Sequence, residues 1–223
     1  LTNTEVDRIL IDNESVTGVS LRNASKYSGP TINSDAVICA VPWDKINLVA
    51  PQKSSRETEK IFTGPPLTSG SIITLHVWLN KPVMDSDFVA ILESELQWVF
   101  NKTKIHETTS NDQQLTISIS DAEKYMSWPK KTLRQFFLEE LIKSFPSINK
   151  KNIVRFLVIK HHQATFLSEP GVENIRYSQK TSVRNFYFAG DWTNTDWPST
   201  MESAVISGRL AAQQLNDLVK EAK

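Results

Sequence analysis

The chain has 223 residues, of which 39% are apolar, and its 25 lysines and arginines balance 25 aspartates and glutamates. This composition is typical of globular proteins and argues against a disordered or fibrous chain; at about 150 residues per domain it allows one large or two small domains. The formal net charge of zero offers no attraction to phosphate backbones, so we expect no nucleic-acid partner.

A single cysteine, Cys39, excludes an intramolecular disulfide and is typical of a reducing compartment. The adjacent His161 and His162 alternate across a predicted strand, with no further ligand nearby, so we expect no metal site. No apolar run reaches the ~18 residues of a membrane span. We expect a cytoplasmic protein, with peripheral contact to the inner face of a membrane as an alternative, because paired lysines flank one predicted helix.

Three β-rich segments open the chain, at 4–11, 16–21 and 32–41. The third is almost continuously apolar from residue 36 to 41, which predicts a strand buried on both faces in a layered α/β environment. A weakly helical segment follows at 52–61. Glycine and proline then gather at 63–70, where we place a domain boundary.

The middle of the chain predicts an antiparallel sheet covered by one helix. Apolar residues recur at three- and four-residue steps over 129–145, which is typical of an amphipathic helix. Ser120 and Glu123 have the spacing of a capping box. The predicted strands lie at 71–79, 88–92, 97–100, 114–119 and 153–160.

A strand, an acidic loop and a helix follow at 186–215, which reads FYFAGDWTNTDWPSTMESAVISGRLAAQQL. Asp191 comes just after the strand, at the edge where open α/β sheets bind ligands, and its carboxylate can accept hydrogen bonds from sugar or ribityl hydroxyls. Gly190 has no side chain, so a ligand can approach its backbone closely. The helix predicted from Thr200 directs unpaired N–H groups at whatever precedes it.

The strings AGDWT and PSTMESAVISG resemble the C-terminal flavin-binding signature of the FAD-dependent amine oxidase and phytoene desaturase superfamily. The order QWVFNK, KHHQATF, AGDWT is similar to its squalene-associated branch, the hydroxysqualene dehydroxylases. The resemblance implies an α/β protein with a partial GR2-type FAD/NAD(P)-binding fold. Its FAD domain is then discontinuous, at 1–62 and 170–223, around an α+β substrate domain at 63–169 built from an antiparallel sheet and a helix.

The same resemblance implies FAD as the cofactor and assigns residues to it. Asp191 is expected at the ribityl or pyrophosphate part, and Thr200 and Met201 beside the flavin ring. Asp196 and Ser203 depart from the pattern, because the branch usually has glycine at both positions. The full set of implied cofactor-binding residues is Val6, Gly190, Asp191, Trp192, Pro198, Thr200, Met201 and Ala204.

The phosphate-binding turn of the superfamily is missing. None of the seven glycines forms GxGxxG after a strand. We therefore expect this chain to be a C-terminal half whose partner is the missing N-terminal half, and to hold no FAD alone.

The amine oxidases of the superfamily carry a lysine near the flavin and an aromatic cage residue, and aligning the motifs by eye places Thr74 and Thr200 at these positions. Both features are absent, which favours an apolar substrate. We assign no catalytic side chain; His76, Glu93 and Glu95 are acid candidates by residue type alone. The expected substrate pocket comprises Thr74, Trp78, Trp98, Phe100 and Trp197.

The function implied by the resemblance is FAD-dependent hydride transfer to a long-chain isoprenoid, namely dehydroxylation of hydroxysqualene to squalene. A phytoene-type carotenoid desaturase, in which hydride moves to the flavin, is the nearest alternative, and a flavin amine oxidase is another. A non-catalytic fragment that binds an apolar ligand or a protein partner is the alternative from a different class.

Overall fold

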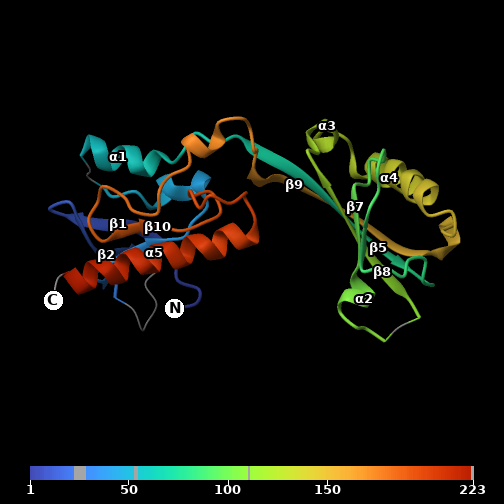
Figure 1. Ribbon diagram of the computed structural model, residues 1–223, viewed down its shortest axis with the longest axis horizontal. Helices are drawn as coiled ribbons and strands as arrows, with labels where there is room; N and C mark the ends of the chain where they lie inside the picture. Colours follow the sequence, from blue (N-terminus) through green and yellow to red (C-terminus); the bar gives the residue numbers. More distant parts are fainter. Residues whose placement is uncertain (23–28, 53–54, 110, 222–223) are drawn as a thin grey trace. The chain divides into compact units, whose positions relative to one another are not determined.

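The computed structural model describes residues 1–22, 29–52, 55–109 and 111–221 (Figure 1). It divides into two compact units. The flanking unit comprises Leu1–Leu67 and Ser168–Lys223, and the central unit comprises Thr68–Leu167. None of the helices in the described ranges is long and apolar enough to cross a bilayer.

The flanking unit contains two small sheets, both built from strands that the sequence predicts. Strands β1 (Val6–Asp12), β2 (Ser15–Leu21) and β3 (Thr31–Asn33) form an antiparallel sheet in that order. Strand β4 (Val37–Cys39) pairs in parallel with β10 (Phe186–Phe188). Residues from opposite ends of the chain therefore meet in one sheet.

The predicted strand at 32–41 is two strands, β3 and β4, separated by a bend. The prediction that it is buried on both faces is wrong, because Ile38 is 38% exposed. The physical reason is that β4 is the outer strand of a two-stranded sheet in the described ranges, and the contacts of α1 and α5 are made with β10.

Two helices lie on opposite sides of β10 (Figure 1). On one side, α1 (Arg56–Thr63) stacks Phe62 on Phe186 with ring centroids 5.4 Å apart. On the other side, α5 (Met201–Glu221) packs Ala211 against Tyr187 and Ala189. A 3-10 helix, Trp43–Val49, precedes α1, and a second, Val172–Asn174, precedes β10. The flanking unit is thus an α/β/α arrangement around a short parallel pair.

The central unit is a five-stranded antiparallel sheet in the order β6-β7-β8-β5-β9. Alternate residues of β5 and β8 are fully buried beneath α4 (Lys130–Ser144), whose Leu133, Phe137 and Leu141 complete the core. The strands are β5 (Ser69–Leu79), β6 (Phe88–Ala90), β7 (Trp98–Asn101), β8 (Gln113–Ser120) and β9 (Ile153–Phe166). The sequence prediction of an antiparallel sheet with one amphipathic helix is confirmed.

The capping-box prediction is wrong. Ser120 is the last residue of β8, and its N–H donates to the side chain of Gln97. The short helix α3 (Glu123–Met126) begins after Ala122 without a side-chain cap. A second short helix, α2 (Lys102–Ile105), follows β7 and is capped by the Asn101 side chain. Spacing alone did not predict where β8 ends.

Candidate functional site

The loop at 191–200 connects β10 to α5 and contains half of the predicted cofactor residues. Gly190, at its start, has φ +149°, a conformation that favours glycine. A Cβ there would lie 2.4 Å from Nε1 of Trp192, so the close approach at Gly190 is made by the chain's own indole. The Gly190 N–H donates to Oγ of Ser207 at 2.8 Å, which holds the loop against α5.

The start of α5 is capped by the chain and surrounded by exposed apolar groups. Oγ1 of Thr200 accepts the N–H of Ser203 at 3.2 Å, an N-cap bond that starts the helix. The first N–H groups of the helix have no acceptor within it. Trp197 is 50% exposed and Met201 is 89% exposed. This end of the helix therefore presents the positive end of the helix dipole beside apolar surface.

The other predicted cofactor residues divide into exposed and buried groups. The Asp191 carboxylate is half-buried and accepts the hydroxyl of Ser199. Pro198 and Ala204 are exposed, and Val6 is half-buried in β1. In contrast, Trp192 is buried and donates Nε1–H to the Val41 carbonyl at 3.1 Å. Its side chain thus packs inside the unit.

Arg176 is a residue of this site that sequence reasoning missed. Its side chain has no exposed surface, and it lies against the loop at 191–200. Both terminal nitrogens donate to loop carbonyl oxygens, at 2.8 Å to those of Asp191 and Trp197. The only sign of this role in the sequence is an isolated arginine in the otherwise uncharged run 174–179. The neighbouring residues do not show to which carbonyl groups it donates.

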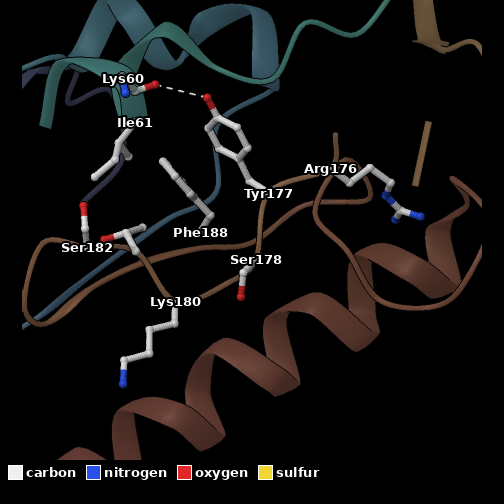
Figure 2. A pocket seen from close by; sticks show the side chains of 9 residues that line it. Lys60, Ile61, Arg176, Tyr177, Ser178, Lys180, Ser182 and Phe188 are labelled. Carbon is white, nitrogen blue, oxygen red and sulfur yellow. Dashed lines mark hydrogen bonds between the residues drawn. The ribbon is translucent and has the colours of Figure 1, made fainter. Parts of the chain in front are cut away.

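A cavity of about 600 Å³ lies between α1 and the segment before β10 (Figure 2). Tyr177 spans it and donates its hydroxyl to the Lys60 carbonyl at 3.1 Å, while burial raises the pKa of that hydroxyl. Figure 2 shows Lys180 pointing away from Lys60, so the two ammonium groups do not converge on an anion. The Arg176 guanidinium is directed away from the cavity, toward the loop.

The second face of the central sheet lacks the helix cover of the first and carries the predicted substrate residues. Thr74 of β5 lies opposite Ser118 of β8, which lies opposite Trp98 of β7. The next row across the same strands joins His76, Thr116 and Phe100. We call this surface the open face and define it by Thr74, His76, Trp78, Phe88, Trp98, Phe100, Thr116, Ser118, Leu157 and Ile159.

Aromatic side chains cluster at one end of the open face. Trp98 stacks on Phe100 with centroids 6.4 Å apart, and Phe88 contacts both rings. These three residues and Ser118 line a hollow of about 300 Å³. Trp78 lies farther along, beneath the Arg155 guanidinium at 4.9 Å. The structure thus brings together the four substrate residues predicted in the central unit, whereas Trp197 belongs to the flanking unit.

Only one of the three acid candidates lies on the open face. His76 accepts or donates through Nδ1 to the Thr116 hydroxyl at 3.1 Å, and burial, with Lys102 and His161 nearby, lowers its pKa. Glu95 pairs with Lys124 at 2.9 Å on another surface. Glu93 is exposed in the turn after β6.

Comparison with known proteins gives one family. Residues 1–216 match the model of the flavin-containing amine oxidoreductases. The chain is 27% identical to a 15-cis-phytoene desaturase of Narcissus pseudonarcissus over 84% of this chain and 34% of that protein. It is 23% identical to the 15-cis-phytoene desaturase of Synechococcus elongatus over 93% of this chain and 45% of that protein. The chain spans about a third to a half of the length of these relatives.

Solved structures give the fold. An oxidoreductase from Methanosarcina mazei superposes with a TM-score of 0.69 at 15% identity, covering 95% of this chain and 49% of that one. Cyclohexylamine oxidase from Brevibacterium oxydans superposes with a TM-score of 0.68 at 18% identity, covering 96% and 48%. The predicted mixed α/β fold is confirmed, and both likenesses extend over about half of the solved chains.

Proposed function

The chain belongs to the family of flavin-containing amine oxidoreductases, and from this premise we propose that it is part of an FAD-dependent oxidoreductase that acts on a long-chain isoprenoid. The observation that carries the substrate class is the open face, a sheet surface on which aromatic and aliphatic side chains remain uncovered. The cofactor follows from the family and from the residues at the start of α5.

The loop and the start of α5 fit a flavin nucleotide in three respects. The Asp191 carboxylate is suited to accept hydrogen bonds from ribityl hydroxyls. The positive end of the α5 dipole favours an anionic partner. The exposed side chains of Trp197 and Met201 offer apolar surface for a flat ring. When bound, FAD supplies reversible hydride acceptance and donation.

A missing N-terminal half remains our proposed partner, and the β4–β10 pair supports it. In the described ranges, β4 hydrogen-bonds to β10 alone. Parallel sheets almost always contain more strands, so a two-stranded parallel pair is small for a complete sheet. We propose that strands of the missing half extend this sheet beside β4. The chain alone should then purify colourless, and stoichiometric yellow flavin on it would refute this proposal.

The open face supports a water-insoluble substrate more than an amine. Among its polar members, Thr74, Thr116 and Ser118 are uncharged and His76 is the single titratable one, and its aromatic end at Trp98 and Phe100 is lined almost wholly by carbon. Small-molecule sites of this composition bind apolar ligands. A flavin amine oxidase is therefore the weaker candidate.

The direction of hydride transfer separates the two isoprenoid reactions. The relatives named above are desaturases, which favours removal of hydride from the substrate and formation of a carbon–carbon double bond. The resemblance of QWVFNK, KHHQATF and AGDWT to the squalene-associated branch supports the opposite direction, in which hydride replaces a departing hydroxide. We propose desaturation first and keep hydroxysqualene dehydroxylation as the second candidate. The cytoplasmic location stays a prediction.

The test is product analysis with the full-length protein that contains this chain. Incubation with phytoene and an electron acceptor that reoxidises the flavin should yield new conjugated double bonds, whereas incubation with hydroxysqualene and a reductant of the flavin should yield no squalene. Squalene formed from hydroxysqualene would establish the second candidate. If neither substrate changes the oxidation state of the flavin, the result would favour the non-catalytic alternative.

Two glycine variants provide a matched control for the cofactor. Gly190→Ala places a methyl group against the Trp192 indole and should abolish flavin retention, because the start of the loop must move. Gly171→Ala also changes a glycine at positive φ, +86°, but into open space. It should retain flavin. Equal flavin content in both variants would show that the loop after Gly190 is not part of the cofactor site.

A further inference from the structure

Arg176 holds a buried positive charge against the loop at 191–200. Its guanidinium donates to the carbonyl oxygens of Asp191, Thr193 and Trp197. These carbonyls lie at both ends and inside the loop, so a single group fixes several peptide planes at once. A planar guanidinium has five donors in a fixed fork, which suits this task.

The same guanidinium reaches the first turn of α5. It lies 3.3 Å from Oγ of Ser203, and that hydroxyl is 2.7 Å from Oγ1 of Thr195. Ser203 is one of the two positions where the superfamily branch usually has glycine. In this chain its hydroxyl is fully buried and joins the loop to the helix through Arg176.

The Arg176 guanidinium pairs with the Glu173 carboxylate at 2.7 Å, and Glu173 is itself 56% exposed. Arg176 also donates to neutral oxygens of the loop and helix. Because a buried cation is costly unless hydrogen bonds satisfy it, the loop conformation that supplies these oxygens is favoured over others.

We propose that Arg176 is a positioning residue for the flavin: it fixes the backbone of Asp191 and Trp197 and the start of α5, which face the cofactor in the proposed function. This inference rests on that proposed function. Arg176 acts through the loop, and its own side chain touches no cofactor in this proposal.

The test compares four variants of the full-length protein by their dissociation constants for FAD, measured by quenching of flavin fluorescence. Arg176→Ala should weaken binding about ten- to a hundredfold, since several charge-assisted hydrogen bonds are lost. Arg176→Lys keeps the charge without the fork and should recover part of the loss. Arg184→Ala is the control, because this arginine of the same unit donates to Ser15 instead. Ser203→Gly removes one acceptor and should have a smaller effect than Arg176→Ala.

Chemical rescue distinguishes the loss of the Arg176 guanidinium from a general loss of stability. Ethylguanidinium should restore FAD binding to Arg176→Ala, whereas ethylammonium, which lacks the fork, should not. Equal FAD affinity in Arg176→Ala and Arg184→Ala would overturn the proposal. So would an unfolded Arg176→Ala variant that ethylguanidinium fails to rescue, because Arg176 would then be a folding residue.

Hydrogen exchange separates failure of this inference from failure of the proposed function. If the wild-type full-length protein binds no FAD, the proposed function fails. Amide exchange over 191–200 then still reports on Arg176, and it should be faster in Arg176→Ala than in Arg184→Ala. Unchanged exchange would overturn the positioning role by itself.

Discussion

The N–H of Gly190 and the Oγ of Ser207 lie 2.8 Å apart and join the end of β10 to the second turn of α5. The same hydroxyl donates to the Ala204 carbonyl at 2.7 Å, so it accepts one bond and donates another. Ser207 has no exposed surface. These bonds explain why a serine lies inside the helix: its hydroxyl accepts the Gly190 N–H at the point where the chain leaves the sheet.

Replacing Ser207 with alanine should loosen this junction. The Gly190 N–H would lose its acceptor in a poorly hydrated position, at a cost of about 1–2 kcal/mol in the free energy of unfolding. Amide exchange of a peptide spanning 189–193 should accelerate. Ser182→Ala, at an exposed serine of the same unit, serves as the control and should leave the exchange unchanged. Identical exchange in the two variants would show that the bond contributes nothing.

Asp196 adopts φ +56°, the left-handed region, at the second position where the superfamily branch usually has glycine. For L-residues this region costs about 1–2 kcal/mol, while a glycine adds about 0.5–1 kcal/mol of chain entropy to folding. Asp196→Gly should therefore leave the free energy of unfolding unchanged or raise it by up to about 1.5 kcal/mol. Urea denaturation of the full-length protein measures this difference.

Ala212→Gly, on the exposed side of α5, is the matched control because it adds a glycine without relieving strain. It should lower the free energy of unfolding by about 1 kcal/mol. The strain argument fails if Asp196→Gly is as destabilising as this control.

Tyr125 makes the stability of the central unit depend on alkaline pH. Burial, followed by the hydrogen bond with Glu95, raises the pKa of its hydroxyl to about 12. The unfolded chain loses this proton near pH 10, as an ordinary tyrosine does. The stabilising contribution is therefore complete below about pH 10 and is lost as pH rises toward about 12.

Tyr125→Phe should remove that part of the pH dependence, which urea midpoints between about pH 9 and 12 would show. The contact with Glu95 raises the pKa of Lys124. The contribution of Lys124 to stability is therefore also lost as pH rises, and Lys124→Met is the companion variant. Parallel curves for wild type and Tyr125→Phe would contradict the assignment to Tyr125.

Periodicity predicted the elements whose burial alternates along the chain. In β5, Ile73, Leu75 and Val77 are fully buried and the residues between them are not, a period-two pattern that sequence displays directly. The helix at 130–144 follows for the same reason. Arg176 and the exposure of Ile38 did not follow, because the first depends on carbonyl groups 15 to 21 residues away and the second on how many strands join β4.

Trp98 provides the most direct test of the open face as a substrate surface. Its ring is 45% exposed and is held by Phe88 and Phe100, so it is ordered before any ligand arrives. Covering part of this ring with an isoprenoid chain is worth about 1–2 kcal/mol, which corresponds to about a five- to thirtyfold change in affinity.

In the full-length protein, Trp98→Ala should therefore raise KM for the isoprenoid about five- to thirtyfold and change kcat much less, because the loss affects ground-state and transition-state binding equally. Trp98→Phe should retain most of the affinity. Leu92→Ala is the control: Leu92 is 86% exposed but lies in the turn after β6, outside the open face. An unchanged KM in Trp98→Ala, or an equal rise in Leu92→Ala, would mean that the substrate binds elsewhere.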